Sequence, residues 1–258
     1  MSCTEIFNFN LVDQDATTIT ASSENAFFPA SNIKDARTTK VWRSVDGVLS
    51  ANIVLDFKTT ETVSHIMVVG DSLRGLGFTS MTIEANITDS WGAPAFSDTL
   101  TPDQEFNLGF KKFATAQSYR FWRITISGGG NFVELSNLML ANESGLTRGI
   151  DFGWSYRNRD LSRADVNRYA QRFIDEITEQ QSIRAKFSNM EKNDFEILQN
   201  IFDQNGKRKP IWIVVDSTET ISNNLERFAG VYYIVDTPQF RNKTFSRYEC
   251  TLRLVEAT

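Results

Sequence analysis

The chain alternates between apolar and polar positions over many short stretches, a pattern typical of β-strands with one buried face. The clearest stretch is Met81–Thr88, in which every second side chain is apolar and the residues between are polar. Ala51–Phe57 alternates in the same way, and Val63–Gly70 is almost continuously apolar, as in the middle of a sandwich. These three stretches predict three strands of one antiparallel β-sandwich.

Ser118–Leu140 is predicted to close this sandwich as a β-hairpin. The alternation up to Ser127 is followed by Gly128–Gly130, which can supply the positive φ angles of a tight reversal. A second apolar strand then ends at Leu140, and its phase slips by one residue between Leu135 and Leu138, which predicts a β-bulge.

The second half of the chain is predicted to be a β domain with one helix. Ser188–Gly206 has apolar residues at helical spacing, a capping box formed by Ser188 and Glu191, and a glycine at the expected end. We therefore expect a helix over about 189–204. Strands are expected at Pro210–Val215, Gly230–Val235 and Phe245–Val255.

Two stretches before this helix are harder to assign from pattern alone. The segment Arg157–Arg168 is charged and has no apolar face, so it is expected to be a loop. Residues Tyr169–Gln180 fit either a helix stripe or strands, and we favour strands because Gln181–Phe187 alternates.

The length of 258 residues fits two domains of ordinary size. The short, polar and glycine-containing stretch Ala141–Gly149 is the expected boundary, with one domain over 1–143 and the other over 144–258. The fold class is therefore mainly β: a jelly-roll β-sandwich followed by a β-sandwich or barrel with one flanking helix.

Charge and cysteine content narrow the range of partners. The net charge of −5 comes from the part up to Leu146, where 16 acidic residues face 10 basic ones. Neither half is basic enough for nucleic-acid binding to be the main task, and no apolar run is long enough for membrane insertion. Cys3 and Cys250 form no metal-ligand spacing, and Cys250 is expected to be a small buried hydrophobe.

No catalytic motif is present in the sequence, so we expect a protein that is not an enzyme and needs no cofactor or metal. The single histidine, His65, lies in an apolar strand and is expected to be a satisfied core or edge residue. No nucleophile elbow and no Walker A sequence occurs. Paired carboxylates such as Asp175-Glu176 are expected to be solvated, and a facing pair across a cleft cannot be deduced from sequence.

Several segments of the first half resemble, in their order, the discoidin or F5/8 type C group of galactose-binding-like jelly rolls. The matching pieces are SNIKDARTTKVWRS, ANIVLDF, VSHIMVVG, and YRFWRITI followed by VELSNLML. The resemblance implies ligand-binding loops at one end of the sandwich. Trp42 matches a structural tryptophan of that family and is expected in the core, whereas Arg74, Trp91 and Phe96 are candidates for glycan or partner contact.

The second half resembles the ring-forming, tail-tube-like domain of distal tail proteins of long-tailed bacteriophages. The resemblance lies in the order of strands, helix, GKRKPIWIVVD, FAGVYYI and a final alternating strand. It implies a homo-oligomeric, hexameric ring that contacts tail tube, hub and fibre proteins. Candidates for contacts between subunits are five arginines: Arg157, Arg159, Arg163, Arg168 and Arg172.

Together these observations predict a structural virion protein of a phage tail tip, assembled in the host cytoplasm, whose ring joins the tail tube to hub or receptor-binding components. The sandwich would decorate the ring and contact cell-surface glycans or other tail proteins. The alternative is a free-standing carbohydrate-binding protein, with the first half as the lectin. A solvated loop is an equally good interpretation of the five arginines.

Overall fold

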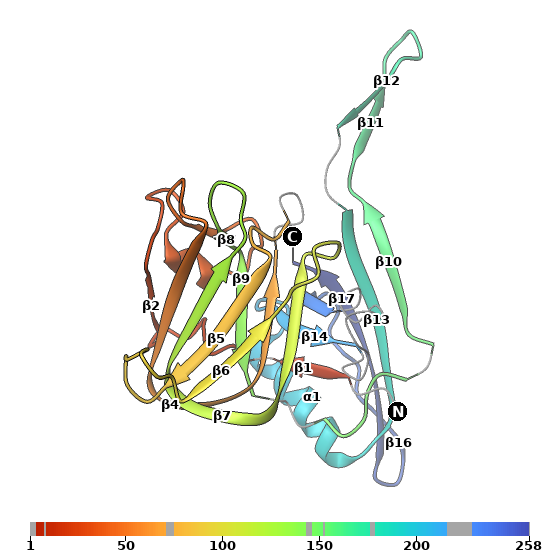
Figure 1. Cartoon of the computed structure of the whole chain (residues 1–258). Helices are drawn as coiled ribbons and strands as arrows, with labels where there is room; N and C mark the ends of the chain where they lie inside the picture. Colours follow the sequence, from red (N-terminus) through yellow and green to blue (C-terminus); the bar gives the residue numbers. More distant parts are fainter. Residues whose placement is uncertain are drawn as a thin grey trace.

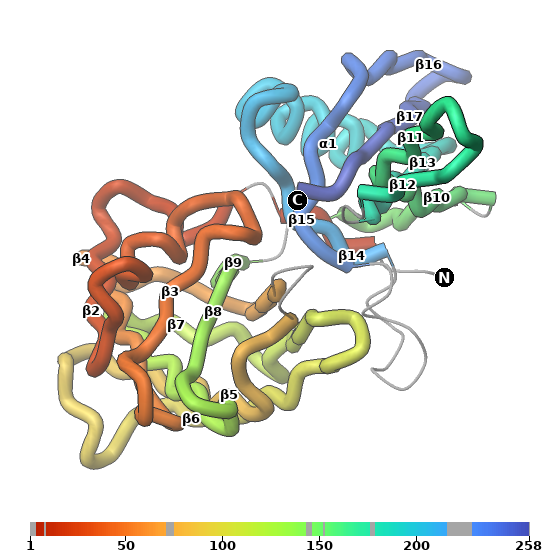
Figure 2. Tube along the Cα trace, turned by 90° about the horizontal axis from the view of Figure 1, so that it is seen from above, coloured from red at the N-terminus to blue at the C-terminus, as the bar shows by residue number. Residues whose placement is uncertain are grey.

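The computed structural model describes residues 4–7, 9–70, 75–142, 146–151, 153–175, 179–215 and 229–257. They form two β-rich lobes that lie side by side (Figures 1 and 2). The mainly β fold class predicted from alternation is confirmed. Among the described residues, no helix has the length and apolar character that crossing a membrane requires.

The first lobe is a sandwich whose main sheet has the strand order β2-β4-β7-β5-β6, with β9 added beside β4. A small second sheet pairs β3 with β8. The strand bounds in this lobe are Thr18–Ala21 (β2), Trp42–Arg43 (β3), Ser50–Val69 (β4), Ser80–Asn86 (β5), Phe96–Leu100 (β6), Leu108–Ser127 (β7), Glu134–Leu135 (β8) and Asn137–Ala141 (β9), and a short 3-10 helix spans Ala30–Lys34.

The predicted hairpin at Ser118–Leu140 is wrong, because its two halves pair with different strands. The first half belongs to β7, which lies between β4 and β5, whereas β9 pairs with the far half of β4. Gly128 has a φ of 89° and starts the connection as expected. The predicted bulge is instead a break at Ser136, since β8 pairs with β3 and β9 with β4.

The core of the sandwich is built by the alternation seen in the sequence. Ile53, Leu55, Ile83, Trp122 and Ile124 all face inward and are fully buried. Trp42 is also fully buried, as predicted, and its indole N–H donates to the carbonyl oxygen of Ser23 at 3.1 Å. The hydrophobic effect of these side chains holds the main sheet against the β3–β8 layer.

The second lobe is a seven-stranded antiparallel sheet of order β1-β14-β15-β17-β13-β10, with β16 added to β17. The bounds are Glu5–Phe7 (β1), Ser155–Asp160 (β10), Glu179–Met190 (β13), Ile211–Val214 (β14), Ala229–Ile234 (β15), Arg241–Thr244 (β16) and Arg247–Glu256 (β17). Cys250 is buried on β17 as expected, and burial raises the pKa of its thiol to about 12.

One helix, α1 (Lys192–Asn205), packs on this sheet close to the predicted range. The predicted capping box is wrong: β13 continues through Ser188 to Met190, and Glu191 becomes the N-cap without a side-chain capping bond. Gly206 ends the helix as predicted, with a φ of 56° and its N–H donating to the carbonyl oxygen of Phe202 at 2.7 Å.

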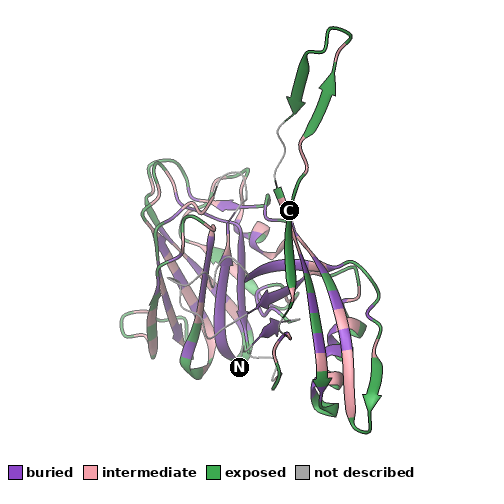
Figure 3. Cartoon of the chain, turned by 90° about the vertical axis from the view of Figure 1, so that its right-hand side faces the viewer, coloured by how far each residue is buried: buried purple, intermediate pink, exposed green. Residues whose placement is uncertain are grey.

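The segment predicted to be a charged loop forms strands. Residues Ser155–Asp160 pair with β13, and β11 (Arg163–Val166) pairs with β12 (Arg172–Asp175) in a separate ribbon. We call β10, β11, β12 and the first residues of β13 the arm. Figures 1 and 3 show the β11–β12 ribbon of the arm projecting beyond the rest of the chain, whereas β10 runs along the edge of the second sheet. All residues of β10, β11 and β12 are exposed.

The first strand belongs to the second lobe, although the predicted boundary placed residues 1–143 together. Residues Glu5–Phe7 pair antiparallel with Trp212–Val214 of β14, so the chain enters the second sheet, builds the sandwich and then returns. A separate apolar cluster joins the lobes, with Phe7 and Trp212 from one side and Met67, Phe110 and Met139 from the other. The two lobes therefore share the strand pairing of β1 with β14 and a common apolar cluster.

Candidate functional site

The residues predicted for glycan contact do not gather into one site. Trp91 lies in the β5–β6 connection, half-buried, and its indole N–H donates to Asp89 Oδ1 at 2.7 Å. Phe96 packs inward against Phe113, with ring centroids 5.0 Å apart, and therefore belongs to the core. Arg74 lies outside the described residues.

One face of Trp91 is already covered by a cation. The guanidinium carbon of Arg123 lies 4.7 Å from the Trp91 ring centroid, and Arg123 is itself held by Glu84 through an Nη2–Oε2 distance of 2.6 Å. A cation–π contact of this kind orients the indole ring. Trp91 is thus one of several half-exposed aromatic residues of the sandwich, and its ring orientation is fixed by these contacts.

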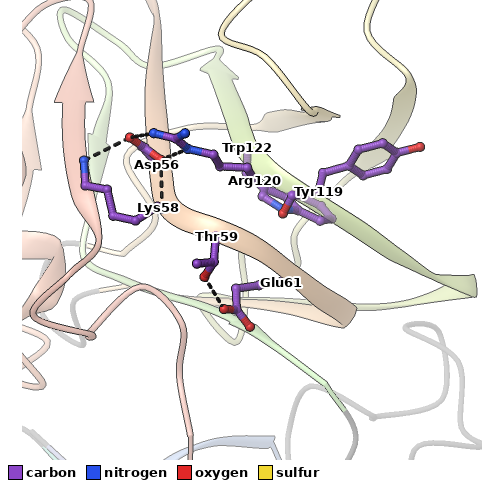
Figure 4. Close-up of polar contacts among 7 residues, drawn as sticks. All are labelled: Asp56, Lys58, Thr59, Glu61, Tyr119, Arg120 and Trp122. Atoms are coloured by element: carbon purple, nitrogen blue, oxygen red, sulfur yellow. Dashed lines mark hydrogen bonds and ion pairs between the residues drawn. The ribbon is translucent and has the colours of Figure 1, made fainter.

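A second polar group lies where β4 and β7 change register, shown in Figure 4. Arg120 donates from Nε and Nη2 to the two carboxylate oxygens of Asp56 at 2.7 and 3.0 Å, and Lys58 Nζ adds a bond of 2.9 Å. These bonds, of which those from Arg120 have the largest effect, hold the pKa of the Asp56 carboxyl well below its usual range. Both carboxylate oxygens of Asp56 therefore accept hydrogen bonds from cationic side chains, and the ion pair with Arg120 links β4 to β7.

His65 is fully buried between the lobes, in agreement with the expected core position. Its Nε2 lies 2.6 Å from Glu5 Oε2, and its Nδ1 lies 2.7 Å from the Ser64 hydroxyl. Lys112 Nζ approaches the other Glu5 oxygen at 3.2 Å. Phe7 and Phe110 pack on the imidazole ring, so this polar set sits inside the junction and links β1 to the sandwich.

The parts of the chain that the structure describes hold no group of three or more His, Cys, Asp or Glu side chains arranged for a metal ion. The expectation of no metal site and no cofactor stays a prediction for the complete chain.

The structure places all five predicted inter-subunit arginines on the arm. Arg157 and Arg159 lie on β10, Arg163 on β11, Arg168 in the turn and Arg172 on β12, and all five are exposed. The sequence analysis expected a loop for four of these arginines and favoured strands for the segment that holds Arg172; their role between subunits stays a prediction.

Large apolar side chains accompany these arginines, and sequence reasoning missed their role. Val166, Tyr169, Phe173 and Ile174 are 64, 69, 59 and 55% exposed. In the sequence Tyr169, Phe173 and Ile174 fit a helix stripe or strands, and Val166 falls in the segment expected to be a charged loop. The pattern alone does not show that these side chains are exposed. An exposed run of this kind, rimmed by charge, is typical of an interaction surface.

A cleft of about 580 Å³ opens between the lobes, on residues that sequence reasoning did not select. Phe9, Asp13 and Asp15 line it from the first lobe's entry segment, and Lys209 and Trp212 line it from the second. Phe9 is 52% exposed although the next residue, Asn10, is buried. The sequence indicated this cleft only weakly, through an aromatic residue, Phe9, followed by two aspartates, Asp13 and Asp15.

Comparison with known proteins finds no matching family model and no matching curated protein. Among solved structures, the chain is similar to a GH29 fucosidase from Ruminococcus gnavus in complex with fucose, with a TM-score of 0.46 and 15% identity. That match covers 53% of this chain and only 27% of the fucosidase chain.

Two separate binding modules are also similar. One is the family 32 carbohydrate-binding module of a C. perfringens protein in complex with galactose (TM-score 0.42, 19% identity, 54% of this chain and 98% of that chain). The other is chitosan-binding module 1 of a Paenibacillus chitosanase/glucanase (TM-score 0.41, 24% identity, 52% and 99%). The structural neighbours of this chain thus include carbohydrate-binding modules of galactose-binding-like type, and the likeness to phage tail-tip proteins stays a prediction.

Proposed function

We propose that this chain is a non-catalytic structural subunit that assembles with copies of itself into a ring, and that the ring forms part of a phage tail tip. The observation that carries the proposal is the arm, which exposes five arginines and, on the ribbon outside both lobes, large apolar side chains. The order of elements in the second half supports the tail-tip assignment. The other partners would be tail tube, hub and fibre proteins.

In an isolated chain the apolar side chains of the arm stay in water, and the free-energy cost of this exposure favours self-assembly. A two-stranded ribbon is marginally stable in water unless a further surface covers one face. Val166, Phe173 and Ile174 each leave more than half of their surface in water, and burying such a side chain is worth about 1.5–3 kcal/mol. A contact in which the arm of one copy covers a different surface of the next is heterologous, and such contacts close into rings or continue as filaments.

The test is the mass and shape of the purified chain. We expect light scattering to give a closed oligomer and negative-stain images to show rings, with the sandwich lobes outside. Replacing Arg163–Asp175 with a short Gly-Ser turn should yield a monomer that melts at nearly the same temperature, since this ribbon contributes nothing to either core. A native chain that is strictly monomeric would overturn the proposal.

A second candidate function is carbohydrate binding by the sandwich, favoured by the orientation of Trp91 over Arg123 beside Asp89. A half-exposed indole flanked by a cation and a carboxylate can stack on a sugar ring and hold its hydroxyls. On a glycan array, the native chain should bind a subset of sugars, Trp91→Ala should lose that binding and Trp91→Phe should retain part of it. Equal binding by all three variants would exclude this site.

A further inference from the structure

We infer that the arm of one copy ends in the cleft between the two lobes of a second copy, with Arg168 and Tyr169 as the inserted residues. The inference rests on the self-assembly proposed above and names the surface that receives the arm. Its evidence is the match in charge and in apolar character between the arm's turn and the cleft.

The turn at the end of the arm presents these two residues in a defined arrangement. Asn167 Oδ1 accepts the backbone N–H groups of Tyr169 and Gln171 at 2.9 and 3.0 Å, which closes the turn tightly. Arg168 Nη2 donates to the Tyr169 hydroxyl at 2.6 Å, and its guanidinium carbon lies 4.7 Å from the tyrosine ring centroid. Preorganisation of this kind lowers the entropic cost of binding.

The cleft offers the complementary chemistry. Asp15 provides a carboxylate, Asp13 provides a second one whose pKa is raised to about 7, chiefly by burial, and Lys209 provides an ammonium. The turn and its flanking residue carry Arg168 and Arg172. Carboxylates are the partners that a guanidinium binds in bidentate geometry. The exposed ring of Phe9 supplies an apolar wall for the Tyr169 ring, and aromatic pairs of this kind add stabilisation beyond their buried area.

The arm does not contact the cleft of its own chain. Figures 1 and 3 show the ribbon of β11 and β12 projecting free of both lobes, while the cleft lies where the lobes meet. The contact must therefore be made with another copy. Because donor and receiving surfaces differ, each copy can give one arm and accept one, which is the arrangement that generates a ring.

A charge-swap experiment tests this contact. Arg168→Glu alone and the double variant Asp13→Lys/Asp15→Lys alone should each weaken association at least about tenfold, because each opposes like charges. Combining all three substitutions in one chain should restore association toward the native value. Matched controls on exposed residues away from both surfaces, Arg241→Glu and Asp46→Lys, should leave the sedimentation profile unchanged.

A disulfide cross-link provides a second measurement. In a Cys3→Ser background, Tyr169→Cys together with Asp15→Cys should form covalent dimers and higher species under mild oxidation, whereas either cysteine alone should not form the series. If replacing the arm abolishes assembly but cleft substitutions and cross-links have no effect, the cleft assignment is overturned and the proposed ring stands. If the native chain is monomeric, both are overturned.

Discussion

Replacing Trp122 with alanine is expected to lower the free energy of unfolding of the sandwich lobe by about 3–5 kcal/mol, the cost of removing a fully buried large aromatic. Trp122 is the centre of an aromatic cluster: the ring centroids of Phe96 and Phe113 each lie 6.0 Å from it, and that of Tyr119 lies at 6.5 Å. Its removal leaves these rings around a cavity. Urea denaturation followed by circular dichroism measures the loss.

Trp91→Ala is the matched control, because it removes the same side chain from a half-buried loop position. We expect a much smaller loss there, and Trp122→Phe should fall between the two variants. Equal losses for Trp91→Ala and Trp122→Ala would contradict the assignment of Trp122 to the centre of the core.

Replacing Glu5 with alanine is expected to lower the free energy of unfolding by about 1–3 kcal/mol, because it removes the carboxylate beside the fully buried His65 imidazole at the junction of the lobes. Glu5 faces both His65 at 2.6 Å and Lys112 at 3.2 Å, and its strand is held in the second sheet by β14 alone. Glu5→Gln keeps the shape of the side chain and should lose less. The urea midpoint and the susceptibility of the junction to proteolysis both report the effect.

Glu191→Ala serves as the control for this second prediction. Glu191 pairs with Arg247 at 2.8 Å, but the Glu191 side chain is 64% exposed and surface pairs of this kind contribute little. We expect no measurable change in the urea midpoint. A Glu5→Ala protein as stable as Glu191→Ala would show that the apolar cluster of Phe7 and Trp212 joins the lobes without help from the buried pair.

Local patterns in the sequence predicted the strands that bury one face. Ala51–Phe57 lies within β4 with the predicted side chains inward, because alternation depends only on each strand's own two faces. Met81–Thr88 was predicted correctly only up to Asn86, where β5 ends, and Ile87 is 65% exposed instead of facing inward. The end of α1 at Gly206 was predictable for a similar reason, since the left-handed conformation required there favours glycine.

Pairing over long distances was not predictable in the same way. The apparent hairpin at Ser118–Leu140 has the alternation and the glycine turn of a hairpin, yet β4 separates β7 from β9. Likewise, nothing in Glu5–Phe7 indicates that its partner is β14, about two hundred residues later. Which strands become neighbours depends on the burial of whole faces, to which each segment contributes only a part.

The same division applies to the candidate site. The amino-acid sequence alone determined which residues form strands with a buried face, where the helix ends, and that five arginines cluster in one segment. Only the tertiary structure decided that this segment is an arm carrying exposed aromatics, that Phe96 is core, and that Phe9 and Asp15 line a cleft with Lys209. The physical reason is that the exposure of a side chain, and the residues it contacts, depend on how distant segments pack. Alternation and turn preference depend only on residues that are neighbours in the chain.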